Sequence, residues 1–231
     1  TEMLRGDGRI AYSLEEGFTG TDTIFAAQPA LAAALLASFQ HTAAVEDLEL
    51  AERIMQVAKR DFWHQPGYFA DIQLTDQNLG MLKQPLADLE SNGQAAEVLN
   101  HLSVLTGKAE YLDWAKQVIQ NLAGEVNAAS ASSAALVQAA VKIVHPPVHA
   151  IIVGDPMNEK TSLLWDGCLS LQHPNLLIEV LNPKDRAERL KVLSLEDSPE
   201  PYAILICGDK RSEIVSGAET LPEAIKSLEK K

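Results

Sequence analysis

The chain has 231 residues, of which 46% are hydrophobic and 22% are charged, a composition typical of a folded globular protein. Its 19 basic and 32 acidic residues give a net charge of -13 without a Lys/Arg cluster, so we expect no nucleic-acid partner. The most apolar stretch, 26–39, is too short to cross a bilayer, so we expect no membrane partner. Cys168 and Cys207 form no Cys-x-x-Cys pair, which favours a reducing, cytoplasmic location.

Helical periodicity dominates the first 147 residues. Leu31, Leu35 and Phe39 recur at helical spacing after Pro29, which predicts a helix over about 28–40. A second apolar stripe predicts a helix over about 46–61, and a short turn at 42–45 makes the two helices a hairpin. A further helix is expected over 132–144, because His145-Pro146-Pro147 then ends the pattern.

An internal repeat relates the helical segments. The stretch TAAVEDLELAERIMQVA, residues 42–58, aligns without a gap with TGKAEYLDWAKQVIQNL, residues 106–122. Such self-similarity indicates repeated αα-hairpins, which place the connections between hairpins at one common end. Five helices do not close a ring of hairpins, so we expect the open flank to be covered by the second domain, a second copy or further chain.

The connection between the two hairpins is the first candidate site. It runs over about 62–91, which is longer than a structural turn requires. Trp63, Tyr68 and Phe69 surround a Pro-Gly turn there, and Asp71 and Asp88 supply carboxylates, a combination that sugar-binding pockets use. The alternative is that these rings form a satellite core over the hairpin ends.

The chain changes character at Val148. Three short apolar runs, HAIIVGD, NLLIEVL and PYAILICGD, predict strands, and helices are expected over 159–172 and 221–229. Continuous apolar runs are typical of buried parallel strands, so residues 148–231 are interpreted as a small α/β domain with a mainly parallel sheet, after an αα-hairpin domain over 1–147. The stretch VGDPMNEKTS has neither a dinucleotide fingerprint nor a P-loop, so we expect no cofactor.

Cys207 is the second candidate site. It ends the third apolar run close to Lys210 and Arg211, cations that lower the pKa of a thiol and make it reactive toward redox partners. The alternative is that Cys207 is a small buried hydrophobic residue, as Cys168 is expected to be. The histidines show no metal-ligand spacing, so we expect no metal site.

The order of these pieces resembles a known family. The segments DGRIAYS, LLASFQHT, GYF, DLESNGQAAEVLNHLSVLTGKAEYLDWA, IIVGDP and PYAILICGD are similar to the C-terminal portion of the YyaL-like, spermatogenesis-associated thioredoxin-domain-containing proteins. The resemblance covers nearly the whole chain. It implies a six-hairpin (α/α) toroid similar to sugar epimerases and toroidal glycosidases, followed by a small α/β segment, in a protein that also has a thioredoxin-like domain.

The resemblance also places site residues. The family's Asp-Tyr-Ala at the start of an inner helix falls on Gln28-Pro29-Ala30, so that acid is absent. Its Asp-Gly-x-x-Pro-Ser-Gly-Asn-Ser loop falls on DLESNGQA, which keeps Asp88 and Ser91 and reverses the order of Asn92 and Gly93. Its paired C-terminal cysteines are reduced to Cys207.

Three functions are therefore compatible with the sequence. The altered pocket and the incomplete ring favour a non-catalytic interaction or assembly module, with a protein partner or self-association at the open hairpin flank. The alternative is a carbohydrate-active domain with a sugar ligand, in which Asp88 is the catalytic acid/base and the substrate contacts are Trp63, Tyr68, Phe69, Asp71, Ser91 and Asn92. The third is a thiol-dependent function at Cys207.

Overall fold

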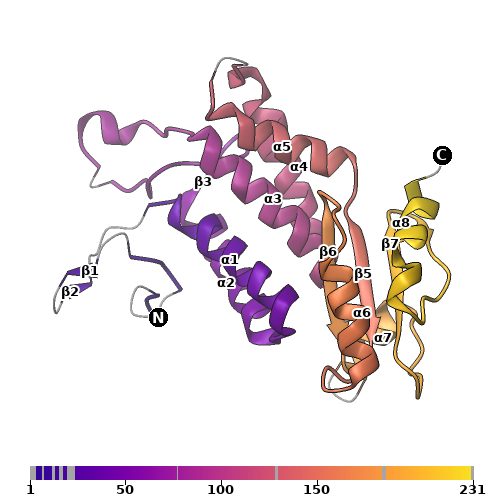
Figure 1. The fold of residues 1–231 in the computed structure, drawn as a ribbon. Helices are drawn as coiled ribbons and strands as arrows, with labels where there is room; N and C mark the ends of the chain where they lie inside the picture. The colour runs from indigo at the N-terminus through magenta and orange to yellow at the C-terminus, as the bar shows by residue number, and fades with distance from the viewer. Residues whose placement is uncertain are drawn as a thin grey trace. The chain divides into compact units, whose positions relative to one another are not determined.

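A computed structural model describes residues 4–6, 8–11, 14–15, 18–19, 24–76, 78–127, 130–183 and 186–229. The chain divides into two compact units (Figure 1). We call Thr1–Ser38 with Ala44–Val144 the helical unit, and Phe39–Ala43 with His145–Lys231 the sheet unit. Within the described residues, no helix combines the length and the apolarity that crossing a bilayer requires.

Five α-helices make up most of the helical unit: α1 (Ala27–Thr42), whose residues 39–42 count with the sheet unit, α2 (Val45–Phe62), α3 (Leu89–Thr106), α4 (Ala109–Leu122) and α5 (Ser133–Val144). Short elements join them: β1 (Leu14–Glu15), β2 (Phe18–Thr19), β3 (Trp63–His64), β4 (Tyr68–Phe69) and the 3₁₀ turns η1 (Gly80–Lys83) and η2 (Ala123–Glu125). The helices lie where the periodicity predicts them. A closed toroid needs more hairpins than these, so the toroid stays a prediction.

The packing of α3 explains Gly93. α3 packs against both α4 and α5. A Cβ atom at Gly93 would lie 2.4 Å from the backbone carbon of Ala135 and 2.4 Å from the backbone nitrogen of Leu136. Gly93 therefore lets the backbones of α3 and α5 approach closely, which is a packing role rather than a role in a pocket.

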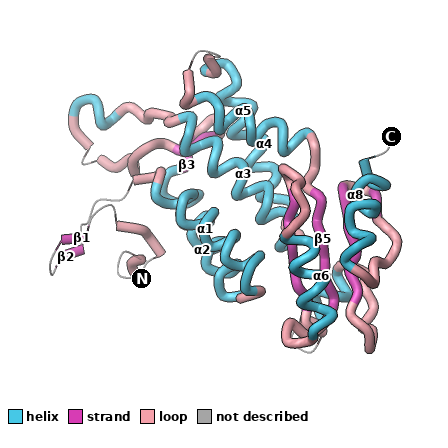
Figure 2. The backbone as a smooth tube through the Cα atoms, viewed as in Figure 1, coloured by secondary structure: helices cyan, strands magenta, loops and turns pink. Residues whose placement is uncertain are grey.

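The sheet unit contains eight elements: β5 (Val148–Val153), α6 (Glu159–Leu169), β6 (Leu176–Leu181), α7 (Ala187–Val192), β7 (Tyr202–Cys207), β8 (Lys210–Arg211), the 3₁₀ turn η3 (Ala218–Thr220) and α8 (Leu221–Glu229). The strand order is β6-β5-β7-β8 (Figure 2). β5 pairs in parallel with β6 but antiparallel with β7, and β7 pairs antiparallel with β8.

The prediction of a mainly parallel sheet is therefore wrong, and the fold is a mixed α+β one. The run of β7 is apolar because both faces of that strand are covered, and burial on two faces does not depend on strand direction. One face of the sheet is covered by α6 and α8 and includes Val148, Ala150 and Leu205. The other face packs around Leu190 of the six-residue helix α7.

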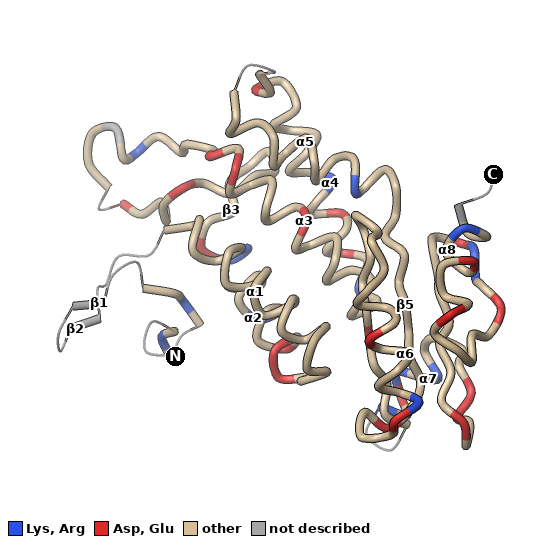
Figure 3. The backbone as a smooth tube through the Cα atoms, in the orientation of Figure 1, with Lys and Arg blue, Asp and Glu red and all other residues tan. Residues whose placement is uncertain are grey.

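Charge is distributed unevenly over the helices of the helical unit. Figure 3 shows no Lys, Arg, Asp or Glu along α1, and Lys142 is the one such residue in the sequence of α5. By contrast, α2 carries Glu46 and Asp47 in its first turn and Lys59 and Arg60 in its last, an arrangement that complements the helix dipole.

Candidate functional site

The β3–β4 hairpin holds the aromatic residues that the sequence singles out. Trp63 pairs with Phe69 and His64 with Tyr68 across the hairpin. Phe69 is fully buried and stacks on Phe25, with ring centroids 4.5 Å apart, while Trp63 meets Phe69 edge-on at 4.9 Å. Phe69 is thus a core residue, whereas Trp63 and Tyr68 keep part of their surface exposed.

Asn92 ties α3 to this hairpin. Its Oδ1 accepts a hydrogen bond from the backbone nitrogen of Phe69 at 2.9 Å. Its Nδ2 donates to the carbonyl oxygens of Phe69 and Asp88, each at 2.9 Å. Because both ends of this fully buried amide are bound to backbone groups, Asn92 has a structural role at the position predicted for a sugar contact.

Asp88 is the N-cap of α3. Its carboxylate accepts a hydrogen bond from the backbone nitrogen of Ser91 at 2.8 Å and a second one from the Ser91 hydroxyl. The carboxylate remains solvent-exposed, but it is committed to two donors on its own helix. The structure thus places Asp88, Ser91 and Asn92 in one turn, next to Phe69, and uses them to begin the helix.

Two buried polar groups of the helical unit lack such partners. Gln28 is fully buried, and neither its Oε1 nor its Nε2 has a hydrogen-bond partner among the described residues. Oδ1 of Asp71 is likewise buried without one, although the backbone of Asp71 is bound by Phe25 and Leu86. An unpaired buried amide costs about 1–3 kcal/mol, so core packing does not account for Gln28.

Lys59 occupies one face of Trp63. Its Nζ lies 2.9 Å from the centroid of the Trp63 ring and 4.9 Å from that of Trp114. Burial lowers the pKa of Lys59 to about 8, while the two ring faces favour the charged ammonium. A sugar could therefore stack on Trp63 at this face only if Lys59 moved.

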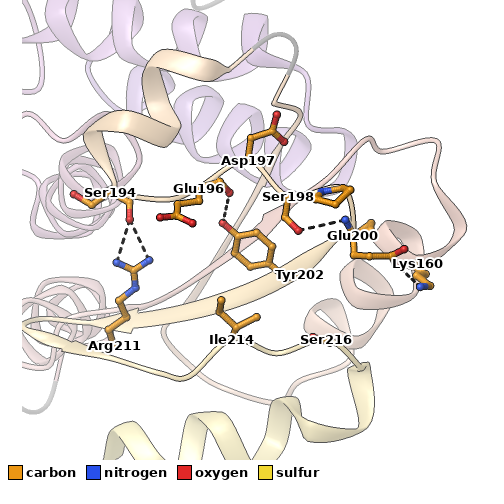
Figure 4. A pocket seen from close by; sticks show the side chains of 12 residues that line it. Lys160, Ser194, Glu196, Asp197, Ser198, Glu200, Tyr202, Arg211, Ile214 and Ser216 are labelled. Atoms are coloured by element: carbon orange, nitrogen blue, oxygen red, sulfur yellow. Dashed lines mark hydrogen bonds and ion pairs between the residues drawn. The ribbon is translucent and has the colours of Figure 1, made fainter.

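A cleft with a volume of about 720 Å³ lies in the sheet unit (Figure 4). Three segments line it: the start of α6, the loop that leads from α7 into β7, and the strip of chain that follows β8. Their lining residues are Lys160, Ser194, Glu196, Asp197, Ser198, Pro199, Glu200, Pro201, Tyr202, Arg211, Ile214 and Ser216. The volume lies within the range of ligand-binding clefts.

Polar contacts hold the walls of this cleft. The Tyr202 hydroxyl donates to the carbonyl oxygen of Glu196 at 2.7 Å, and Lys160 forms an ion pair with Glu200. Both Nη atoms of Arg211 lie 3.5 Å from the carbonyl oxygen of Ser194, a long and weak contact. Figure 4 shows the Tyr202 ring between the Arg211 end and the Lys160 end of the cleft, with Ile214 opposite.

A smaller hollow of about 210 Å³ adjoins the cleft, with which it shares the loop 197–201. Its lining includes Asp155, Asn158 and Asn182, which follow β5 and β6. In open α/β sheets ligands bind outside the carboxyl ends of the strands, which is where this hollow lies. A Cβ atom at Gly154 would lie 2.4 Å from Thr161 Oγ1, so the end of β5 requires glycine.

A buried ionic cluster lies under α7. Glu179 of β6 is fully buried, and its carboxylate lies 3.0 Å from His149 Nε2, 3.2 Å from an Arg186 nitrogen and 3.0 Å from an Arg189 nitrogen. Burial raises the pKa of Glu179, but the hydrogen bonds and charges of His149 and Arg189 outweigh it and lower that pKa to about 2. The cluster anchors α7, and with it the loop that lines the cleft.

The two cysteines lie in the sheet unit and are not paired with each other. Cys168 is buried in α6, and burial raises its pKa to about 12, so its thiol is unreactive. Cys207 is partly exposed, with its Sγ 3.5 Å from the carbonyl oxygen of Pro146. Across the part of the chain that the structure describes, no three His, Cys, Asp or Glu side chains are grouped so as to hold a metal ion.

The cleft was not predicted from the sequence. Its residues come from segments separated by up to about fifty positions, and none of them belongs to a catalytic motif. One signal was present: the stretch LEDSPEPY, 195–202, places two prolines and three acidic residues directly before a strand, which is typical of an exposed loop with a defined course.

Comparison with known proteins adds no assignment: no family model matches the chain, and no curated protein matches it. The resemblance to the YyaL-like proteins therefore stays a prediction.

Proposed function

We propose that the protein is a non-catalytic interaction module that assembles through the outer face of α5. The observation that carries this proposal is an apolar stripe on that helix. Val137, Val141 and Val144 recur at steps of four and three and are 46%, 54% and 73% exposed. Exposed valines at this spacing form one continuous ridge, which is typical of a helix that packs against a further helix.

The occupant we propose is a second copy of this chain. The helical unit is built from repeated hairpins, so the chain itself supplies helices of the kind that pack beside α5. The valine ridge carries no charge, since Lys142, the single charged residue of α5, forms an ion pair with Glu97 of α3. The ridge itself is therefore uncharged, although the net charge of -13 on the whole chain opposes the approach of a second copy.

The finer description of the fold belongs to the same proposal. The hairpins form part of an (α/α) toroid, in the C-terminal region of a thioredoxin-domain-containing protein. The sheet unit itself has the element order β-α-β-α-β-β-α, with β7 antiparallel to β5. Residues 154–158, Gly-Asp-Pro-Met-Asn, contain no cysteine at the β5–α6 connection, so a dithiol reaction is not part of the proposal.

Light scattering after size exclusion tests the assembly. We expect the intact chain to show a mass above 25.1 kDa that increases with concentration, and Val141→Glu to restore the monomer. Gln120→Glu is the matched control, because it adds the same charge at an exposed position of α4 and should leave assembly unchanged. A monomer at all submillimolar concentrations would overturn the proposal.

A carbohydrate-active domain is the second candidate, and the unpaired amide of Gln28 is the observation that favours it. A buried amide without partners, near an aromatic cluster, is what a sugar hydroxyl would satisfy. Thermal shift against mono- and disaccharides should then show stabilisation that Trp63→Ala and Gln28→Leu each remove. Asp88→Asn separates catalysis from capping, because asparagine caps a helix as well as aspartate does but has no carboxylate to act as an acid or base. A panel without any stabilising sugar would exclude this candidate.

A further inference from the structure

The edge of the sheet unit after β8 has backbone groups that face outward. β8 ends at Arg211, and the backbone nitrogen of Ser212 still donates to the carbonyl oxygen of Leu205 in β7 at 2.9 Å. Further along, Val215 bonds to Ala203 through both its nitrogen and its oxygen, at 2.8 and 2.7 Å. In an antiparallel ladder, neighbouring residues turn their backbone groups to opposite sides. Ile214 and Ser216 therefore direct theirs away from β7, and neither has a backbone hydrogen bond to another described residue.

Hollows flank this edge on both faces of the sheet. The cleft of about 720 Å³ lies on the face of Tyr202, and a hollow of about 490 Å³ lies on the other face, beside α8. Arg211 and Ile214 line both of them. A chain laid along the edge would thus find space for side chains on either side of the sheet.

The cleft on the first face suits an apolar side chain. Ile214 is 64% exposed and lines this cleft together with Pro199, Pro201 and the buried Tyr202. The hydroxyl of Tyr202 is already bound to Glu196 and its ring is buried, so the exposed side chain of Ile214 provides the apolar surface that a ligand would contact. An aliphatic side chain placed here would bury apolar surface on both partners.

The hollow on the second face suits a basic side chain. Its lining includes Glu213 and Glu223, with Thr220, Ala224 and Ser227. Neither carboxylate has an ion-pair or hydrogen-bond partner for its side chain among the described residues. A lysine or arginine would supply the missing countercharge, and the net charge of -13 would favour the approach of a cation.

We propose that residues 213–216 form a docking edge for an extended polypeptide in which apolar and basic side chains alternate. The backbone of that polypeptide pairs with Ile214 and Ser216, and its side chains alternate between the two hollows because a strand has a period of two. This docking edge belongs to the sheet unit and is independent of the assembly proposed at α5.

The probe for this proposal is a fluorescent hexapeptide of alternating valine and lysine, titrated against the full chain by fluorescence polarisation. A peptide with the same composition in blocks, three valines and then three lysines, controls for general attraction to an acidic protein. We expect the alternating peptide to bind about tenfold more tightly than the block peptide, and N-methylation of its valines to abolish the difference. Equal affinity of all three peptides would overturn the proposal.

Variants of the chain test the contribution of the acidic hollow, and hydrogen exchange tests the backbone pairing. Glu213→Gln/Glu223→Gln should weaken binding about fivefold or more, whereas Glu49→Gln/Glu90→Gln, which removes two exposed acids from the helical unit, should not. Hydrogen exchange should show new protection at the amides of Ile214 and Ser216 when the peptide is bound. Protection elsewhere, or an equal loss in both double variants, would contradict the docking edge. Val141→Glu should leave peptide affinity unchanged, so this result and the assembly result can fail independently.

Discussion

The two units differ in how they satisfy their buried polar groups. In the helical unit, the fully buried Asn92 bonds to backbone groups of α3 and of the β3–β4 hairpin. In the sheet unit, the fully buried Glu179 is satisfied by other side chains, one histidine and two arginines. Backbone partners fix the course of the chain, whereas charged partners make a unit depend on the protonation of a single carboxylate.

Removing that carboxylate should have the largest effect. Glu179→Gln leaves Arg186 and Arg189 buried without a countercharge, so we expect the sheet unit to lose about 3–5 kcal/mol of unfolding free energy. Hydrogen exchange at the amides of β5 measures this locally. Glu188→Gln is the control, because Glu188 is exposed and pairs with Lys191, which is also exposed. If both variants were equally stable, the cluster would not anchor the unit.

Acid should separate the two units. The pKa of Glu179 is lowered from 4.5 to about 2, so its contribution is complete above the unfolded value and is lost as pH falls from about 4.5 to about 2, a change of about 3 kcal/mol. The pKa of Asp61 in the helical unit is shifted in the same direction, since hydrogen bonds from Arg60 and Arg9 lower it to about 2. Arg60 is largely exposed, so solvent screens that pair. At pH 3, hydrogen exchange should therefore increase first at the backbone amides of the sheet unit. An equal increase in both units would contradict this expectation.

The helical unit should instead be sensitive to shape. Gly93→Ala places a Cβ atom against the backbone of α5, and we expect a cost of about 1–3 kcal/mol with exchange increased in α3 and α5. Gly124→Ala is matched to it, because nothing lies within 4 Å of the added atom. Chemical denaturation of the two variants gives the difference, and equal midpoints would show that α3 and α5 can separate without cost.

The smallest effect is expected at the cap of α3. Asp88→Ala removes the acceptor for Ser91, and we expect a loss of about 1 kcal/mol, whereas Asp88→Asn should be close to neutral. Thermal denaturation distinguishes the two. Should Asp88→Ala prove as stable as the parent chain, the carboxylate would not be needed as a cap, and a role in the pocket would gain weight.

The sequence predicted the helices well because their signals are local. Pro29 at the start of α1 and the stripe of α2 are set within a few residues of each other, and the structure confirms both helices. The direction of β7 is not a local property, because a strand buried on two faces has the same composition whichever way it runs. The six-residue helix α7 was not predicted, since it is too short to show a period.

The candidate sites show the same difference between local and long-range signals. The sequence identified a real cluster at Trp63, Phe69 and Asn92, but composition could not distinguish a pocket from a hairpin fastened to a helix. Asp88 followed by Ser91 did contain a local signal, because aspartate is a preferred N-cap residue. The cleft of the sheet unit depends on β7 and the strip 211–216 lying side by side, a long-range pairing that periodicity does not report.

The position of β5 has a consequence for folding. β5 is the first strand of the sheet unit in the chain and lies inside the sheet, so it pairs on both sides with strands that are synthesised later. All six of its residues are buried in the folded unit, and in the unfolded chain VHAIIV is an uncharged, β-branched segment with two open edges. We therefore expect refolding yields to fall as protein concentration rises, with β5 as the segment through which chains first associate.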